Sequence, residues 1–576
     1  MGRLARVALL GGTVIIAGAA VVQLAPQSRG TVDVQLLAFN DFHGALEPAT
    51  GGTGRVGDTE AGGIEYLATH LARLRAASSN TVVVSAGDNV GGTPLLSSLF
   101  HDEASIEALN AAGLQVSALG NHELDEGWWE LYRLQKGGCH PVDGCQDGTP
   151  FTGATFPYLA ANVTLDPRQA DPEKLRLAGI QGTDQRLLLP AFVVREVGGV
   201  RVGFIGVVLQ DVPSVIIPAS VRGLVFGPEP EAANDAARAL REQDVRAIVV
   251  LMHEGGEQGG FASNSGGVDI NGCREMSRAF VDLVSRMSDD IDVVVSGHSH
   301  QAYNCTIGGK LVTSAASAGR LVTDIDLQVR RSDGEVVSKT ARNIIIERDV
   351  AKDPAQTALL AHYRPRADAV GNRVVGSITA SLTRVPNKAG EFSLGDVVAD
   401  AFLEAAKSTP GGNPDLAIWN PGGIRADLIA ASGSGPTPVT YAELFSVMPF
   451  GNEVIVKSIS GAALLRMLEE QFGDDRVRIM QVSDGFTYAY DASRPRGQRI
   501  DPASVRIHGA PLDPARQYRL ATSNFLWDSG DGLTALGQGS SPGSVVVGID
   551  YELLVAHFSR RSSIRPGPQD RIRRIR

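Results

Sequence analysis

The sequence lacks the features of a membrane-embedded or nucleic-acid-binding protein. After the first 30 residues, no segment is long and apolar enough to span a bilayer. Basic residues are also in deficit, with 53 Lys and Arg against 64 Asp and Glu and a net charge of −11. Proteins that bind nucleic-acid polymers non-specifically neutralise phosphates with a basic surface. The charge therefore argues against a polymeric nucleic-acid partner, but not against a small phosphate ligand in a local cationic pocket.

Cysteine is scarce as well, with only four residues in the chain. Cys139 and Cys145 flank the turn-rich stretch "HPVDG", and Cys273 and Cys305 close a longer loop. Neither pair has C-x-x-C spacing, which argues against zinc binding by these thiols. In an exported protein, the economical interpretation is two disulfides, 139–145 and 273–305, with other pairings still open.

The N-terminus is typical of an export segment. Arg3 and Arg6 precede the apolar stretch "VALLGGTVIIAGAAVVQLA", and polar residues begin near Gln27. We predict that residues 1–30 are a signal peptide or an uncleaved membrane anchor, rather than the buried helix of a cytoplasmic chain. No cysteine lies near the end of this stretch, so lipid modification is not expected.

The chain has 576 residues, too many for one hydrophobic core, so two or more domains are expected. Over residues 31–347, β-branched runs alternate with amphipathic helical patterns, which predicts an α/β layered domain. A linker helix is expected within residues 348–372, followed by a second α/β domain over residues 373–560. We expect the basic tail, residues 561–576, to be a solvated, frayed end.

Five predicted strands of the first domain end in side chains that can bind metal. The stretches are "FNDFHG", "SAGDNVGG", "LGNHELD", "VLMHEGG" and "SGHSH". Functional groups gather at the carboxyl ends of strands in α/β sheets, so these side chains can converge although they lie far apart in sequence. They are Asp41, His43, Asp88, Asn121, His122, His253, His298 and His300.

Carboxylate, amide and imidazole ligands together suit divalent Zn, Mn, Fe or Co. Eight such groups are too many for one tetrahedral site, but they fit two ions that share a carboxylate and activate a bridging water. Asp125, three residues after His122, would orient that imidazole and make it more basic. A single motif of this kind is usually a surface loop, whereas five in order favour a metal centre. The remaining histidines have no recognisable partner in the sequence and are interpreted as structural: His70, His101, His140, His362, His508 and His557.

In their order and spacing, these motifs resemble the calcineurin-like metallophosphoesterase family, with its series D-x-H, G-D-N, G-N-H-E, H and G-H-x-H. The resemblance implies a four-layer sandwich with a dinuclear centre, and in-line attack by a metal-bridging hydroxide. By the same resemblance, His122 would act on the phosphate and the leaving-group oxygen, oriented by Asp125. The implied ligands are Asp41, His43 and His300 for the first ion, Asn121, His253 and His298 for the second, and Asp88 as the bridge.

Three loops of the second predicted domain suggest the substrate. In "WNPGGIRADL", Gly422 and Gly423 let the backbone approach an anion, and Arg425 offers a bidentate fork. "MPFGNEV" contains Phe450, and "SNFLWDSGDGL" contains Phe525 and Asp531. Taken singly, each phenylalanine is more typical of a core residue, but two from separate loops can clamp a planar base.

Together, the three loops resemble the C-terminal domain of the 5′-nucleotidase family, which includes UDP-sugar hydrolases and ecto-5′-nucleotidases. The resemblance implies base stacking by Phe450 and Phe525, ribose binding by Asp531, a base contact from Asn420 and phosphate binding by Arg425. There are two departures. Pro421 replaces a glycine of N-G-G-G-I-R and removes one backbone donor, and neither Arg384 nor Lys388 matches the second phosphate-binding cation of the family.

We therefore expect an exported nucleotidase with two metal ions that hydrolyses phosphate monoesters of extracellular nucleotides, as 5′-nucleotidases do. Two alternatives keep the chemistry but change the substrate: a 2′,3′-cyclic-nucleotide phosphodiesterase with 3′-nucleotidase activity, and a UDP-sugar hydrolase. A third alternative is a surface binding or adhesion protein on an inactive phosphatase scaffold. A missing metal ligand would favour that alternative, and none is missing from the motifs. The expected partner is a nucleotide and not a nucleic-acid polymer, and the N-terminal segment offers a possible membrane anchor.

Overall fold

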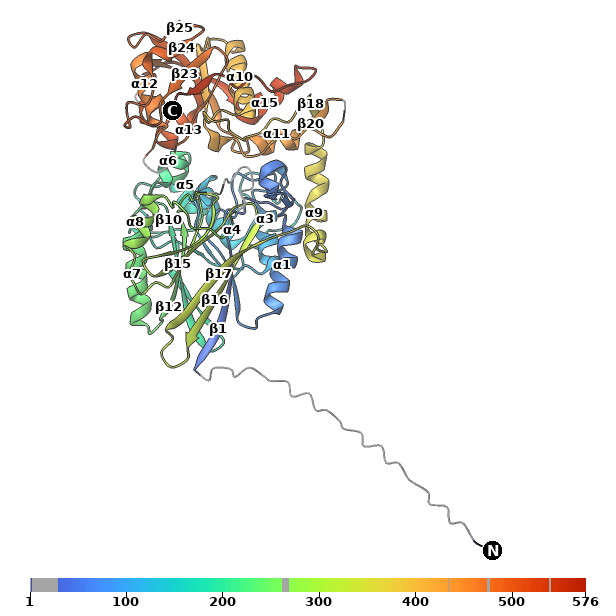
Figure 1. Ribbon diagram of the computed structural model, residues 1–576, viewed down its shortest axis with the longest axis vertical. Coiled ribbons are helices and arrows are strands. Elements are labelled where there is room, and N and C mark those ends of the chain that lie inside the picture. Colours follow the sequence, from blue (N-terminus) through green and yellow to red (C-terminus); the bar gives the residue numbers. More distant parts are fainter. Residues whose placement is uncertain are drawn as a thin grey trace.

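The computed structural model describes residue 2 and residues 30–259, 261, 269–433, 435–473, 477–537 and 540–576. The predicted export segment thus lies almost wholly outside the described residues. Within the described ranges, no helix has the length and apolarity needed to cross a membrane. Figure 1 shows two domains stacked along the long axis, and helix α9 (Pro354–Gly371) runs along one side of both.

Two mixed sheets form the centre of the first domain, and each has six strands. The first sheet has the order β17 (Val336–Ile345), β16 (Leu321–Arg330), β1 (Thr31–Phe39), β4 (Thr81–Ser85), β5 (Val116–Ala118) and β6 (Tyr158–Leu159). The second has the order β14 (Ala302–Ile307), β15 (Lys310–Ala315), β13 (Val293–Ser296), β12 (Ala247–His253), β10 (Val200–Val208) and β9 (Phe192–Val197). Strands β1, β4 and β5 run parallel, as do β10, β12 and β13, so their carboxyl ends share one edge.

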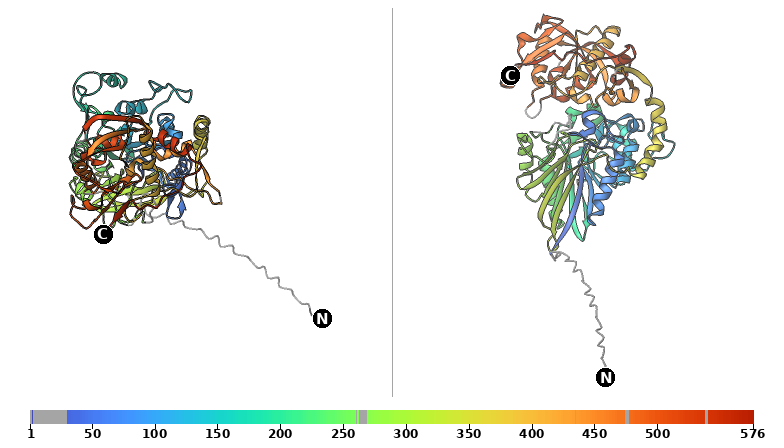
Figure 2. Two further views of the ribbon diagram at one scale, coloured as in Figure 1. Left: turned by 90° about the horizontal axis from the view of Figure 1, so that it is seen from above. Right: turned by 45° about the vertical axis from the view of Figure 1, so that its right-hand side comes forward.

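Alternate side chains of these strands fill separate layers of the core, because successive side chains of a strand point to opposite faces. Leu36 of β1 packs between the two sheets, whereas its neighbour Leu37 packs under the helices of the first sheet. The layers therefore run helix, sheet, sheet, helix, which is the expected four-layer sandwich (Figure 2). The main covering helices are α1 (Ile64–Ala76), α3 (Glu103–Ala112) and α4 (Trp128–Lys136) on one side, and α7 (Glu229–Glu242) and α8 (Arg278–Ser285) on the other.

Helix α9 begins directly after Asp353, whose carboxylate accepts hydrogen bonds from the backbone N–H groups of Ala355 and Gln356. This cap satisfies two of the otherwise unpaired donors of the first turn. The helix packs on α1 and α3 of the first domain and on α11 (Tyr441–Val447) of the second. It therefore contacts both domains along its length.

The second domain contains a five-stranded sheet and a smaller four-stranded sheet. The first has the order β22 (Gln481–Val482), β19 (Leu416–Trp419), β26 (Gln517–Ser523), β21 (Glu453–Ser460) and β27 (Ser540–Ile549). The second has the order β25 (Ala510–Pro511), β24 (Arg506–Ile507), β23 (Phe486–Tyr490) and β28 (Ile572–Arg574). Helices α10 (Ser393–Ser408), α12 (Gly461–Glu470) and α15 (Asp550–Ser559) pack against this framework.

The basic tail differs from the expectation of a solvated, frayed end. Strand β28 pairs in parallel with β23, and Ile572 is buried in the core of the domain. Arg571 Nη2 lies 2.7 Å from Asp400 Oδ2. The expectation was wrong because the open edge of β23 and this carboxylate, both distant in sequence, give the tail partners.

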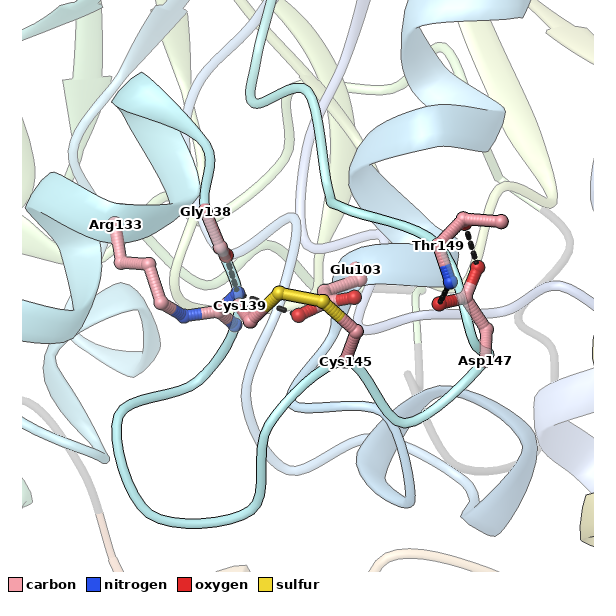
Figure 3. Close-up of a disulfide and its surroundings, with 7 residues drawn as sticks. All are labelled: Glu103, Arg133, Gly138, Cys139, Cys145, Asp147 and Thr149. Atoms are coloured by element: carbon pink, nitrogen blue, oxygen red, sulfur yellow. Dashed lines mark hydrogen bonds and ion pairs between the residues drawn. A yellow bond between two sulfur atoms is a disulfide. The ribbon is translucent and has the colours of Figure 1, made fainter.

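Both expected disulfides are present, Cys139–Cys145 and Cys273–Cys305. Figure 3 shows the first, with Arg133 reaching to Glu103 and to the carbonyl of Gly138, which precedes the disulfide. Beyond Cys145, Asp147 accepts hydrogen bonds from Thr149 (Figure 3). The Arg133 contacts tie the N-terminal end of the short disulfide loop to α3 and α4.

Candidate active site

Each predicted ligand follows the carboxyl end of a strand or closes it. Asp41 and His43 follow β1, Asp88 follows β4, and Asn121 follows β5. In the second sheet, His253 is the last residue of β12, and His298 and His300 follow β13. Because the two sheets face each other, these strand ends meet at one edge of the sandwich.

Most of these residues have an unusual backbone conformation. Five of them have left-handed φ values: Asp41 at 50°, His43 at 47°, Asp88 at 52°, His298 at 64° and His300 at 54°. Residues other than glycine rarely adopt this region, and each instance costs about 1–3 kcal/mol. Such strain persists only where surrounding structure fixes it, and it is concentrated here at one site.

The side chains form two adjacent groups. In the first group, the Nε2 atoms of His43 and His300 are 3.2 Å apart, and His300 Nε2 is 3.3 Å from Asp41 Oδ1. In the second group, Asn121 Oδ1 lies 3.1 Å from His253 Nε2 and 3.0 Å from His298 Nδ1.

Asp88 lies between the two groups. Its Oδ2 atom is 3.6 Å from His43 Nε2 and 3.1 Å from His253 Nε2. Burial alone would raise the pKa of Asp88, but the neighbouring histidines His253 and His122 outweigh it and hold the pKa well below its usual range. The carboxylate is therefore ionised and shared by both groups, which is the geometry that a bridging ligand requires.

His122 stands beside the two groups. Its backbone N–H donates to Asp88 Oδ1 at 2.9 Å, and its Nδ1 atom is 2.8 Å from Asp125 Oδ2. Burial lowers the pKa of His122, but the Asp125 and Asp88 carboxylates raise it above its ordinary value. The remaining ring nitrogen, Nε2, thus belongs to a carboxylate-paired imidazole that is suited to proton donation.

The donor atoms fit divalent metal ions. Within each of the sets Asp41, His43, His300 and Asp88, His253, His298, the ligand atoms all lie within 4.8 Å of one another. Outer hydrogen bonds orient two of the rings: His43 Nδ1 lies 2.9 Å from Gly91 O and His253 Nδ1 lies 2.7 Å from Ala86 O. Backbone carbonyls in this position fix the tautomer that leaves Nε2 free for a metal. Burial and the Arg425 charge lower the pKa of His43, which favours the neutral form that binds a cation.

A cavity of about 700 Å³ opens onto this centre and is lined by both domains. Its lining includes every substrate-binding residue predicted from the sequence: Asn420, Gly422, Gly423, Arg425, Phe450, Phe525 and Asp531. From the first domain it includes His43, Asp88, Asn121, His122, Asp125, His298 and His300. Asp41 and His253 have no exposed surface and lie in the core beneath it.

The second domain contacts the metal-ligand groups directly. Arg425 Nη2 lies 3.1 Å from His43 Nε2, and the Phe450 ring stacks on His122 with 5.5 Å between ring centroids. Burial and the charge of Arg384 lower the pKa of Arg425, so an anion beside this guanidinium would be stabilised. From the sequence, Phe450 is expected to stack on a nucleobase. Its stacking on His122 in the structure was not predicted.

The remaining loop residues have defined partners. Asn420 Nδ2 donates to Asp531 Oδ2 at 2.7 Å. Pro421 is the first residue of the 3-10 helix η4 (Pro421–Gly423), where a backbone donor has no intrahelical acceptor. The replacement of glycine by proline at this position therefore costs the loop little.

Two residues of this region were not identified as site residues from the sequence. Glu123 is 3% exposed and accepts backbone hydrogen bonds from Asp88 at 3.0 Å, Asn89 at 2.7 Å and Gly120 at 2.7 Å. Its position as the last residue of the motif "GNHE" could have identified it from the sequence. Arg478 also lines the cavity, with Nε 3.6 Å from Asp531 Oδ1, and no motif surrounds it.

Arg384, which does not match the second phosphate-binding cation of the family, has a carboxylate partner in the second domain. It forms a buried ion pair with Asp427, with Nε 3.1 Å from Oδ1. Asp427 also accepts from the backbone N–H of Gly52 in the first domain at 3.3 Å. Arg384 lines the cavity and joins the domains, whereas Lys388 is exposed and lies outside the cavity lining.

Comparison with known proteins agrees with this architecture. Residues 34–302 match the model of the calcineurin-like phosphoesterases, and residues 374–538 match the 5′-nucleotidase C-terminal domain. The chain is 30% identical over 513 residues to the endonuclease YhcR of Bacillus subtilis, covering 88% of this chain and 38% of that protein. It is 29% identical to the cell wall protein Lmo0130 of Listeria monocytogenes, covering 89% of this chain and 65% of that protein.

A solved structure extends the likeness to the whole fold. The 5′-nucleotidase precursor from Thermus thermophilus superposes with a TM-score of 0.74 at 25% identity, covering 94% of this chain and 99% of that one. The chain thus covers 99% of the Thermus thermophilus protein. It covers only 38% of YhcR and 65% of Lmo0130.

Proposed function

Because the chain belongs to the 5′-nucleotidase family and is a metal-dependent phosphoester hydrolase, we propose that it releases phosphate from nucleoside 5′-monophosphates. The observation that carries this proposal is the cavity that residues of both domains line. It joins the two ligand groups of the first domain to an arginine, two phenylalanines and an acid of the second. A phosphate monoester, a ribose and a base are the ligand parts that such a lining suits.

We assign the ligands as follows. One divalent ion would be held by Asp41, His43 and His300. A second would be held by Asn121, His253 and His298. Asp88 would bind both ions. When bound, the two ions would supply Lewis acidity that polarises the phosphoryl group. The ligand types are compatible with Zn, Mn, Fe or Co.

The protein side chains would bind and orient the substrate. Arg425 would pair with the phosphate through two parallel hydrogen bonds, in place of its present contact with His43. His122, held by Asp125, would donate a proton to the leaving 5′-oxygen. Asp531 would accept hydrogen bonds from ribose hydroxyls, with Asn420 beside it, and Phe450 and Phe525 would stack on the base.

We further propose that the protein acts outside the cytoplasm. Its two disulfides are typical of oxidising compartments, and one relative is a cell wall protein. We take residues 31–347 as the catalytic domain, 348–372 as the linker and 373–560 as the nucleotide-binding domain, to whose core strand β28 of the tail adds Ile572.

The test is a substrate panel on the purified protein with Mn²⁺ or Zn²⁺, with and without chelator. The panel contains AMP, UMP, 3′-AMP, 2′,3′-cyclic AMP, UDP-glucose and a single-stranded polynucleotide, the last because one relative is an endonuclease. We expect chelator-sensitive phosphate release, fastest from the 5′-monophosphates. Preference for the cyclic or 3′ substrates, for UDP-glucose or for the polymer would reassign the substrate. No hydrolysis of any of them would favour a binding protein.

A further inference from the structure

A second cluster of side chains that can bind metal lies outside the lining of the cavity. Its members come from three separate segments of the chain. His101 lies between α2 (Leu95–Ser98) and α3, and Glu126 lies between η2 (His122–Leu124) and α4. His140 and Asp143 lie on the loop closed by the Cys139–Cys145 disulfide. We propose that these four residues form a binding site for a third divalent transition-metal ion, with zinc the best match.

The donor atoms already meet. His101 Nε2 is 2.9 Å and His140 Nδ1 is 3.3 Å from the same oxygen, Asp143 Oδ2. Ligand atoms of His101, Glu126 and His140 also lie within 4.8 Å of one another. Two imidazoles and one or two carboxylates form a donor set that is common for zinc.

Glu126 acts on the other side of the His101 ring. Its Oε2 atom is 2.8 Å from His101 Nδ1, so His101 is held between two carboxylates. In metal sites, a carboxylate on the distal ring nitrogen orients the ligand and makes it more basic. Glu126 therefore has the position of an outer partner if Nε2 binds the ion, and of a direct ligand if Nδ1 does.

The charges of the cluster suit a dication. Once a metal ion displaces the proton that His101 shares with its two carboxylates, Glu126 and Asp143 contribute two negative charges. The nearby Arg133 does not cancel them, because Glu103 and Glu130 are its ion-pair partners. The rings of His101 and His140 are stacked, with 3.7 Å between centroids and 13° between planes. Two imidazolium ions would repel in that position, so at least one ring is neutral and retains a lone pair for a metal.

The loop that carries His140 and Asp143 is held by surrounding structure before any ion binds. The disulfide closes the loop of His140 and Asp143, and the carbonyl of Gly138, next to Cys139, accepts a hydrogen bond from Arg133 at 2.8 Å (Figure 3). A site whose ligands are held by surrounding structure loses less entropy on binding. Metal coordination would tilt the two rings out of their stack and release the proton that His101 now shares with its carboxylates.

This site is separate from the catalytic centre but adjacent in the chain. Asp125 faces His122, and the next residue, Glu126, faces His101. An ion in the cluster would thus fix the backbone that carries Asp125.

The experiment is a metal count by plasma mass spectrometry on the intact protein. Wild type, H140A, D143N and H101N are equilibrated with excess zinc and passed through a desalting column. H101N is chosen because asparagine tolerates the left-handed φ of 48° at this position. H362A is the matched control, because His362 is an exposed histidine paired to a single carboxylate, Asp147, at 3.0 Å.

We expect each of the three cluster variants to hold one zinc ion fewer per chain than wild type, and H362A to hold the same number. With cobalt in place of zinc, the visible absorption of wild type minus H140A is expected to show d–d bands. Circular dichroism confirms that each variant is folded, and phosphate release reports separately on the catalytic centre. Equal metal content in wild type and all cluster variants, or an equal loss in H362A, would overturn the proposal, whatever the phosphatase assay shows.

Discussion

Replacing Glu123 by glutamine is expected to impair both stability and turnover, although Glu123 contacts no substrate. In the structure, Oε2 of Glu123 accepts hydrogen bonds from the backbone N–H groups of Asp88 and Gly120. Its other oxygen, Oε1, accepts one from the backbone N–H of Asn89. Glutamine has a single acceptor oxygen. If that oxygen keeps the two bonds of Oε2, the amide NH₂ group faces the N–H of Asn89, and one buried donor loses its partner.

The magnitude follows from the hydrogen bonds. Burial and the Asp88 charge raise the pKa of Glu123 to about 7, so the comparison is made at about pH 8.5, where the carboxylate is ionised. A hydrogen bond to a charged acceptor contributes about 1.5–3 kcal/mol, and a buried donor without a partner costs about 1–3 kcal/mol. We expect E123Q to lose about 2–4 kcal/mol of unfolding free energy. Because the affected backbone carries Asp88, and misplacement by about 1 Å can cost about 100-fold in rate, kcat is expected to fall by about 10- to 100-fold.

Urea unfolding and phosphate release from AMP measure the two effects. The matched control is E130Q, since Glu130 is also buried but pairs with Arg133 of its own helix α4. We expect E130Q to lose stability while keeping turnover. Wild-type kcat in E123Q at saturating metal, or an equal loss of kcat in E130Q, would refute the assignment of Glu123 as a positioning residue.

Three further predictions follow from the site and its surroundings. R425K keeps the charge but loses the planar fork, so kcat/KM for AMP is expected to fall about 10-fold or more, measured by steady-state kinetics. D427A leaves Arg384 buried without its carboxylate and is expected to cost about 3 kcal/mol in urea unfolding, whereas the double variant R384M/D427L recovers part of that loss. Burial raises the pKa of Asp292 to about 6, so the folded state retains this proton at a pH where the unfolded chain has lost it. Wild-type stability should therefore decrease relative to D292N as pH rises from about 4 to about 7, by at most about 3 kcal/mol, and a pH-independent difference would contradict this.

The sequence was sufficient for the parts of the site that local motifs determine. Asp41, Asp88, Asn121 and His298 each follow a recognisable buried strand, and parallel strands bring their carboxyl ends to one edge. The pairing of the ligands into groups depends on tertiary packing, and only the family resemblance suggested it. The order of the strands in the two sheets was not predicted.

Several contacts that the sequence does not indicate join distant segments. His101 and His140 were interpreted as structural because neither has a ligand-type neighbour in a motif, yet the disulfide loop brings them into ring contact. Arg384 does not match the second phosphate-binding cation of the family, and its actual partner, Asp427, lies 43 positions away in sequence. The basic tail was expected to be solvated because its partners, β23 and Asp400, are encoded far from it.

The most direct test of the central claim, that one metal centre built on Asp88 hydrolyses nucleotides, is phosphate release from AMP by wild type and D88N. Asparagine tolerates the left-handed φ of 52° at this position, so D88N removes the shared negative charge with little change in backbone. We predict chelator-sensitive release by wild type and a loss of about 1000-fold or more in D88N, since the charge that binds both ions is gone. Undiminished turnover in folded D88N would contradict the account.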